Sequence, residues 1–229
     1  SDNGMPFPRA KSNNYEYGTH VPFAVRWGDG ISAHQDVTDF ISLTDIAPTF
    51  LDLAGITPPQ EMTGKSFRQQ LLAKKSGRID KQRNAAYSGF ERHIGDARLE
   101  NRGYPSRAIH TDNYLFIQNM APERWPAGRP PMLADIDDGS PSKNLLIQQH
   151  DKYAPLWELA AGKRPAEELY SIDRDPAQLS NIASDPEFQS IKINLAESLS
   201  AQMKKTADPW ATGNGLQFDS YIDYSGKKP

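Results

Sequence analysis

The pattern of apolar and polar positions divides the chain into two parts. Residues 21–27, VPFAVRW, form a nearly unbroken apolar run, which is typical of a strand buried on both faces of a parallel sheet. Residues 42–55, SLTDIAPTFLDLAG, predict a helix with Thr44 or Asp45 as its cap and Gly55 as its stop. The predicted apolar face of this helix consists of Ile46, Phe50 and Leu53. A strand, a loop and a helix in this order indicate the last part of an α/β sheet.

Beyond residue 84 the pattern changes to short segments in which apolar and polar residues partly alternate. Such alternation predicts strands, and the Asp112–Asn113 pair predicts a tight hairpin between two of them. The predicted strands are 84–90, 106–112, 114–120 and 167–173. Residues 121–142 are rich in Pro, Gly and Asp and lack periodicity, so we expect a long surface loop there.

A final helix is predicted to begin at Asp185-Pro186-Glu187, which combines a cap, a proline at the first helical position and an acid in the first turn. Its apolar stripe consists of Phe188, Ile191, Leu195, Leu199 and Met203. We expect this helix to pack on a smaller antiparallel sheet. The Gly-rich, aromatic tail from Trp210 onward is expected to lie extended over the surface.

Composition narrows the class of protein. The 229 residues have a formal charge of -3 at pH 7, whereas nucleic-acid binding needs a basic excess that neutralises phosphates. No apolar run approaches the length of a membrane span. The absence of cysteine excludes disulfides, thiolate zinc sites and a cysteine nucleophile within these residues.

Asp2-Asn3-Gly4 is the first stretch with candidate chemistry. A carboxylate and an amide at adjacent positions can both face a hard cation such as calcium, and the glycine lets the backbone leave without blocking the site. Lys11 could return from downstream to hold an anionic group on the metal, as phosphoryl and sulfuryl transfer require. From the residues alone, a plain Asn-Gly turn and a solvated lysine remain the alternatives.

Longer motifs of the chain resemble type I sulfatases of the alkaline phosphatase superfamily. One motif is SDNG…PFPRAKSNNYEYGTHVPFAVRWG. It resembles the family segment in which Asp-Asn completes the calcium site and a downstream Lys or Arg contacts the sulfate. The helix that follows in the family is similar to VTDFISLTDIAPTFLDLAGITPP, and its C-terminal signature is similar to EELYSIDRDPAQLSNIASDP. Within the family, the chain resembles the heparan N-sulfatase branch, also called sulfamidase or N-sulfoglucosamine sulfohydrolase. The segments that carry this resemblance are SDNGMPFP, YPSRAIHTDNYLFIQN and DPW.

This resemblance implies that Asp2 and Asn3 ligate calcium and that Lys11 binds the sulfate and takes part in catalysis. The nucleophile of the family is a formylglycine made in a C/S-x-P-x-R motif, which this chain lacks, so it is expected upstream of Ser1. The chain alone is therefore expected to be inactive. His20 stands where the family often has Arg, and it is interpreted as a structural residue.

The fold class that the resemblance implies is α/β. Residues 1–75 would form the end of an alkaline-phosphatase-like catalytic domain, whose earlier strands lie outside this chain. Residues 76–229 would form a smaller α+β subdomain with an antiparallel sheet and a packed C-terminal helix. Separated from the rest of that domain, the chain is expected to expose an incomplete sheet and to associate.

Sugar contacts are expected from Glu91, Arg92 and His93, because sulfatases build part of the sugar pocket from such a C-terminal loop. Guanidinium groups suit uronate carboxylates and sulfates through forked hydrogen bonds. A structural role for these three residues remains an equal alternative. Arg107 is interpreted as structural, paired with a buried carboxylate.

Two further groups of residues have open interpretations. The acidic residues of the long loop lack the spacing and the closing Glu of an EF-hand, so a solvated acidic loop is favoured over a second calcium site. These residues are Asp135, Asp137 and Asp138. Trp125 could stack on a sugar ring or cover part of the core.

The predicted function is that of the C-terminal portion of a calcium-dependent sulfatase. Its substrate would be a sulfated saccharide, N-sulfoglucosamine or another sugar of glycosaminoglycan (heparan sulfate) degradation, in a periplasmic, secreted or lysosome-like compartment. The alternatives are a phospho- or phosphonate-ester hydrolase of the same superfamily and a non-catalytic carbohydrate-binding or assembly module. Expected partners are the saccharide and the N-terminal half of the same enzyme, with no nucleic acid and no membrane span.

Overall fold

The computed structural model describes residues 1–222, and contacts within it divide the chain into two compact units. Unit 1 consists of Ser1, Asn3–Val21 and the residues from Ser88 onward, and unit 2 consists of Asp2 and Pro22–Tyr87. None of the described helices is both long enough and apolar enough to cross a membrane.

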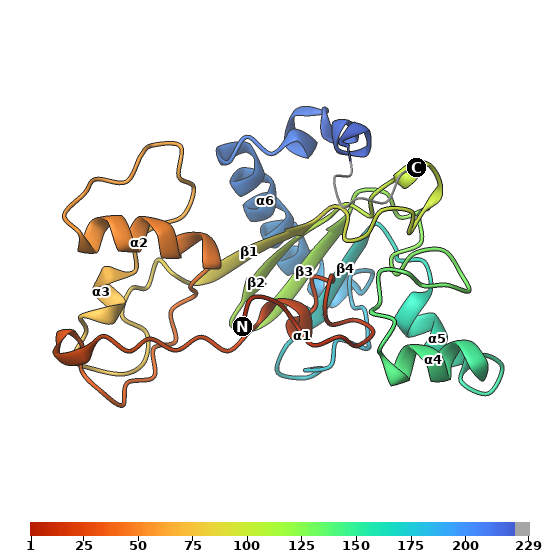
Figure 1. The fold of residues 1–229 in the computed structure, drawn as a ribbon, viewed down its shortest axis with the longest axis horizontal. Helices are drawn as coiled ribbons and strands as arrows, with labels where there is room; N and C mark the ends of the chain where they lie inside the picture. The colour runs from red at the N-terminus through yellow and green to blue at the C-terminus, as the bar shows by residue number, and fades with distance from the viewer. Residues whose placement is uncertain (223–229) are drawn as a thin grey trace. The chain divides into compact units, whose positions relative to one another are not determined.

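The described strands form one sheet with the strand order β1-β2-β3-β4, and all of it except the first residues of β1 belongs to unit 1 (Figure 1). The strands are β1 (Ala85–Phe90), β2 (Ser106–Thr111), β3 (Tyr114–Asn119) and β4 (Glu167–Ser171). β2 pairs antiparallel with β3, and β3 pairs antiparallel with β4. The four predicted strands and the hairpin at Asp112–Asn113 are thus confirmed, and residues 121–140 form the predicted irregular loop.

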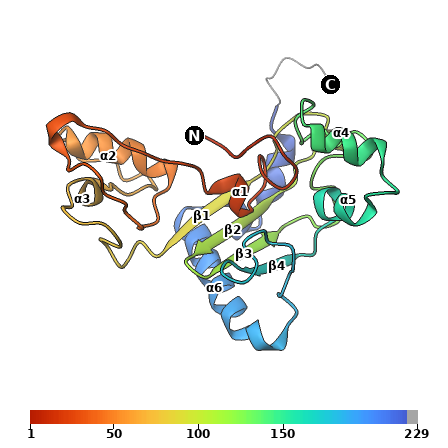
Figure 2. The ribbon, with the colours of Figure 1, turned by 90° about the horizontal axis from the view of Figure 1, so that it is seen from below.

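The two faces of this sheet are covered by different parts of the chain. One face carries Ala108, Leu115, Ile117 and Tyr170, which cluster with the buried Tyr15 from the N-terminal segment. Side chains alternate along a strand, so Ile109, Phe116 and Leu169 point to the other face. There α6 (Gln189–Lys205) packs on β2 and β3. Figure 2 shows α6 and the short helix α1 (Glu16–Thr19) on opposite sides of the sheet.

Helix α6 follows its predicted start closely. A 3-10 turn, Pro186–Phe188, comes first, and the Asp185 side chain accepts a hydrogen bond of 2.9 Å from the Glu187 N–H. The apolar stripe buries Leu195, Leu199 and Met203. The prediction of this helix from its capping residue and its apolar stripe is therefore confirmed.

Two helices of unit 1 are absent from the prediction. They are α4 (Pro141–Gln148) and α5 (Ala154–Ala161). Ser140 caps α4 by accepting from the Lys143 N–H, with Pro141 at the first helical position. Only Lys143 and Leu146 of α4 are buried, so its sequence lacks the wide apolar stripe that identifies a helix. Ile147 of α4 and Trp157 of α5 pack on a small core of Ala127, Leu133, Ile136 and Ala161.

Unit 2 contains α2 (Ile46–Leu53) and α3 (Arg68–Leu71). A 3-10 turn, Leu43–Asp45, precedes α2, where Ser42 and Asp45 form a reciprocal capping box. The helix and its stop at Gly55, with φ +75°, are as predicted, but the predicted buried face is wrong. Phe50 is 67% exposed, whereas Pro48 and Thr49 are buried.

Residues 21–27 are not a strand in the structure, which corrects the first prediction. A 3-10 turn follows at Gly28–Gly30, and Phe23, Val25 and Trp27 are exposed. An apolar run becomes a strand only beside a hydrogen-bonded neighbour, and no described strand pairs with this run.

The tail also departs from its prediction. It forms two 3-10 segments, Pro209–Thr212 and Gly215–Ser220, instead of an extended chain. Gly215 permits this folding, because a Cβ there would lie 2.0 Å from the Trp210 ring. The last residues of the tail, 223–229, lie outside the described residues.

Candidate active-site segment

The segment that contains Lys11 is a compact loop fixed by its own backbone. Met5 O accepts hydrogen bonds from the Phe7 N–H (2.8 Å) and the Lys11 N–H (3.0 Å). Gly4 lies directly against α1, since a Cβ at this position would be 2.2 Å from Tyr17 O. The glycine of the Asp-Asn-Gly motif therefore has a packing reason, because no larger residue fits this approach.

Tyr15 anchors this loop to the sheet of unit 1. Its side chain is buried, and its hydroxyl donates a 2.7 Å hydrogen bond to Glu168 Oε2 on β4. The Arg9 guanidinium lies 3.7 Å above the Tyr15 ring, within cation–π distance. Burial raises the pKa of Tyr15 to about 12, so its hydroxyl remains a donor at physiological pH.

Lys11 reaches a carboxylate that the sequence did not assign to the site. Its Nζ lies 3.1 Å from Oδ1 and 3.0 Å from Oδ2 of Asp137, in the long loop. Both side chains remain partly exposed, at 29% for Lys11 and 31% for Asp137. The structure thus brings residues 11 and 137 together, although no local pattern links positions so far apart.

The prediction of a solvated acidic loop is wrong for Asp135 and holds for Asp138, while Asp137 is partly exposed. Asp135 is buried and forms an ion pair with Arg98, and Asp137 contacts Lys11. Asp138 is exposed and lies 2.8 Å from the Nζ of Lys143. Each carboxylate lies beside its own cation, and the loop that contains them buries Leu133 and Ile136.

Asp2 and Asn3, the predicted calcium ligands, are exposed. The Asn3 carbonyl accepts a 2.9 Å hydrogen bond from Ser1 Oγ, and Asn3 lies at a bend. A carboxylate and an amide oxygen suit calcium, which takes six to eight oxygen ligands. Among the described residues no group of three His, Cys, Asp or Glu side chains could hold a metal. The pair offers two oxygen atoms of the kind that calcium binds, which is fewer than a complete calcium site needs.

Two of the three predicted sugar contacts have protein partners in the structure. Glu91 Oε1 accepts from Arg107 Nη2 (2.5 Å) and from Trp210 Nε1 (2.9 Å), while burial raises the pKa of Glu91. Arg92 donates to two backbone carbonyls, those of Asn101 and Tyr221, each at 2.9 Å. Both side chains hold the loop after β1 in place.

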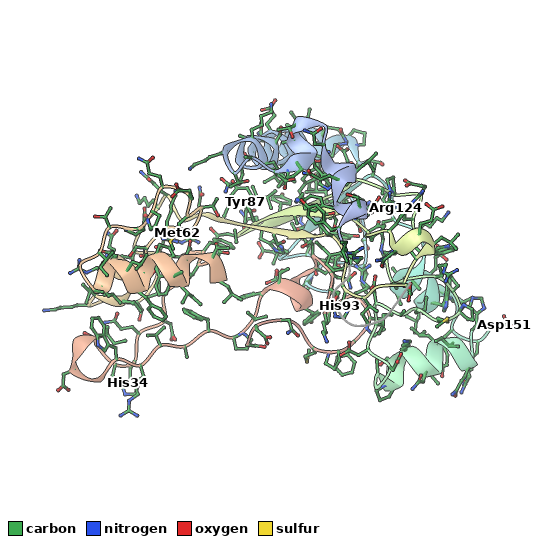
Figure 3. The ribbon with its side chains drawn as sticks, turned by 45° about the horizontal axis from the view of Figure 1, so that its top comes forward. His34, Met62, Tyr87, His93, Arg124 and Asp151 are labelled. Carbon is green, nitrogen blue, oxygen red and sulfur yellow. The ribbon has the colours of Figure 1, made fainter. Side chains whose placement is uncertain are left out.

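His93 differs from its two neighbours. Its Nδ1 is buried and has no hydrogen-bond partner among the described residues. A buried polar atom without a partner carries a desolvation cost, which a ligand or a water molecule can relieve. Figure 3 labels this residue among the side chains of unit 1. Of the three predicted sugar contacts, His93 is the one with a buried polar atom that lacks a hydrogen-bond partner among the described residues.

The structural interpretation of Arg107 and of His20 agrees with the contacts. Arg107 Nε donates to Asp208 Oδ2 at 2.5 Å, which ties the segment after α6 to β2. Exposed His20 contacts Glu16 one turn earlier in the chain. Trp125 forms an edge-to-face pair with Trp157, with ring centroids 6.3 Å apart, so its ring contributes to packing beside α5.

Comparison with known proteins shows that the chain is similar to sulfatases. A family model described as "N-sulphoglucosamine sulphohydrolase, C-terminal" matches residues 10–126. An ulvan-active sulfatase of Formosa agariphila is 30% identical over 193 residues, covering 84% of this chain and 34% of that protein. Human N-sulphoglucosamine sulphohydrolase is 27% identical over 235 residues, covering 92% of this chain and 41% of the human protein. The chain thus spans about a third of the length of the curated relatives it matches.

One solved structure also resembles this chain along most of its length. A protein in complex with its substrate D-glucosamine-2-N,6-O-disulfate has a TM-score of 0.57 at 19% identity. The match covers 85% of this chain and 30% of that one. At this identity the likeness shows a shared fold.

Proposed function

Because the chain belongs to the family of N-sulphoglucosamine sulphohydrolase C-terminal regions, we propose that it is the C-terminal portion of a calcium-dependent sulfatase. The predicted fold class, the C-terminal part of an alkaline-phosphatase-like sulfatase, is confirmed by the solved structures of similar fold. The observation that supports the proposal most is the family match, which spans Lys11 and the loop at residues 91–93. The division of the chain into a catalytic part (1–75) and a subdomain (76–229) remains a prediction.

The substrate we propose is a sulfated sugar, N-sulfoglucosamine or another saccharide derived from a glycosaminoglycan. The similarity to human N-sulphoglucosamine sulphohydrolase over 92% of this chain supports this class. His93 is partly exposed, and its Nδ1 has no protein partner among the described residues, so of the three predicted residues we assign it the hydrogen bond with a sugar hydroxyl. Glu91 and Arg92 would shape the loop that presents it.

In this proposal Asp2 and Asn3 supply two oxygen ligands of the calcium ion. When bound, calcium would withdraw charge from the sulfate oxygens, and a formylglycine elsewhere in the enzyme would supply the nucleophile. The part played by this chain is to bind and orient the sulfate. The Lys11 ammonium would donate to a sulfate oxygen and stabilise the negative charge that develops there. The cell compartment, periplasmic, secreted or lysosome-like, belongs to the same proposal.

The test is an assay of the purified full-length enzyme on three substrates: N-sulfoglucosamine, glucosamine 6-O-sulfate and a phosphate monoester. We expect release of sulfate from at least one sugar and loss of that activity on chelation of calcium, with recovery when calcium is restored. Preferential release of phosphate would support the phosphohydrolase alternative. Saccharide binding without any release would support a binding module.

A further inference from the structure

The ion pair between Lys11 and Asp137 joins the predicted sulfate-binding residue to a part of unit 1 far away in the sequence. Both Asp137 oxygens lie within 3.1 Å of the Lys11 Nζ. An ammonium has three N–H donors. Because the pair is partly exposed, the ammonium can keep its contact with Asp137 and still donate to a ligand.

Asp137 is held firmly on its own side of the pair. The preceding residues, Asp135 and Ile136, are buried, and the Asp135 carboxylate is paired with Arg98. The Lys143 Nζ donates a 2.8 Å hydrogen bond to Ile136 O, and the Asp137 carbonyl accepts from the Ser140 N–H at 3.0 Å. The carboxylate therefore projects from a packed stretch of the loop.

Apart from its contact with Asp137, Lys11 is held only through hydrogen bonds of its backbone. Its N–H donates to Met5 O, and its carbonyl accepts a 3.0 Å hydrogen bond from Asn13 Nδ2. The flexible four-carbon side chain beyond this point has many rotamers, and ordering it costs conformational entropy. A fixed carboxylate beside the ammonium selects one placement before any ligand arrives.

We propose that Asp137 is a positioning residue that holds the Lys11 ammonium in place for the substrate sulfate. This inference rests on the proposed function and adds a residue from the long loop to its site. The contact lies partly in solvent, so it is weak enough to adjust when a sulfate oxygen shares the ammonium. Removal of the carboxylate leaves Lys11 charged but free to adopt unproductive rotamers.

The test is a double-mutant cycle in the full-length enzyme with Asp137→Asn, Lys11→Ala and the combined variant. We expect Asp137→Asn to lower kcat/KM about two- to fivefold, the size of one partly exposed ion pair. In the Lys11→Ala background the same substitution should have no further effect, because its only route of action is gone. Asp137→Glu should keep most of the activity. Calcium affinity and the melting temperature should be unchanged in all Asp137 variants.

The matched control is Asp151→Asn, which removes one exposed carboxylate in the turn between α4 and α5 (Figure 3). If Asp137→Asn behaves like this control, or lowers kcat/KM equally in both backgrounds, Asp137 does not act through Lys11 and the inference is overturned. If Lys11→Ala itself retains normal turnover, the role of Lys11 in the proposed function fails as well. If Asp137→Asn lowers the melting temperature, Asp137→Ser takes its place in the double-mutant cycle.

Discussion

At the scale of single residues, one buried carboxylate fixes the loop that contains Lys11. Glu168 is 2% exposed and accepts from Tyr15 (2.7 Å), Tyr170 (2.6 Å) and Asn119 (2.8 Å). Its neighbour Glu167 points the other way along β4 and contacts Lys192 at the surface. A buried charge is tolerated only when its hydrogen bonds are satisfied, and these three donors meet that need.

Glu168→Gln leaves a single acceptor oxygen, so its NH₂ must face either the two tyrosine hydroxyls or the Asn119 amide. At least one of the three hydrogen bonds is therefore lost in a buried site. We expect this substitution to lower the free energy of unfolding by about 1–3 kcal/mol, as for an unsatisfied buried polar group. The measurement is urea denaturation of the full-length protein at pH 7. Glu167→Gln, at the partly exposed neighbouring position, should stay within about 0.5 kcal/mol of wild type. Equal effects of the two substitutions would show that the Tyr15–Glu168 contact does not stabilise the fold.

The sequence predicted the chemistry of single residues better than their partners. Arg107 was expected to pair with a carboxylate, and it does, with Asp208 and Glu91. The contact of Lys11 with Asp137 was not foreseen. Its members are 126 positions apart, and pairs of this kind depend on how the loops pack over the sheet. Local propensity and spacing contain no information about such packing.

At the scale of elements, the successful predictions share a strong local signal. The strands β2 and β3 have a hairpin turn between them, and α6 has both a cap and an apolar stripe. The run at 21–27 failed because a strand needs a partner that its own sequence cannot specify. Helices α4 and α5 were missed because they are short and bury few residues.

In unit 2, the buried carboxylate of Asp39 links separate segments of the chain through its hydrogen bonds. Asp39 accepts from the N–H groups of Ile79 and Asp80, both at 2.7 Å, and from Gln70 Nε2 at 2.8 Å. Burial alone would raise the pKa of Asp39, but these hydrogen bonds outweigh it and lower the pKa. The ionised Asp39 side chain therefore stabilises the folded protein at pH values above its ordinary pKa of 3.8. This stabilisation is lost as the pH falls through the lower pKa that Asp39 has in the folded state.

Asp39→Asn should release the two backbone N–H groups in part, because a neutral amide oxygen is a weaker acceptor than a carboxylate. We expect amide hydrogen exchange at Ile79 and Asp80 to speed up about five- to a hundredfold at pH 7, equivalent to about 1–3 kcal/mol. The same acceleration should appear in the wild type as the solution is acidified below the pKa of Asp39, after correction for intrinsic exchange. Asp36→Asn, at an exposed position nearby, is the control. Unchanged exchange in Asp39→Asn would contradict this role.

At the scale of the whole molecule, the chain supplies a fold and part of a site. The loop that contains Lys11 is fixed on the sheet of unit 1 through Tyr15, and the exposed Asp2 and Asn3 precede it in the chain. Unit 2 exposes Phe23, Trp27 and Phe50, large apolar side chains that further protein can cover. These features fit a chain that spans about a third of the length of its relatives.

In the proposed site, Asp2 acts on the metal and Lys11 acts on the sulfate. The most direct measurement is calcium affinity, by titration calorimetry, together with turnover of N-sulfoglucosamine and of glucosamine 6-O-sulfate by Asp2→Ala, Asn3→Ala and Lys11→Ala in the full-length enzyme. Asp2→Ala should weaken calcium binding and activity together, and Asn3→Ala should do so less, because it removes a neutral ligand. Lys11→Ala should bind calcium normally but turn over about 10²- to 10³-fold more slowly. Normal calcium affinity and normal turnover in Asp2→Ala would contradict the account, because the first residues would then be a plain Asn-Gly turn.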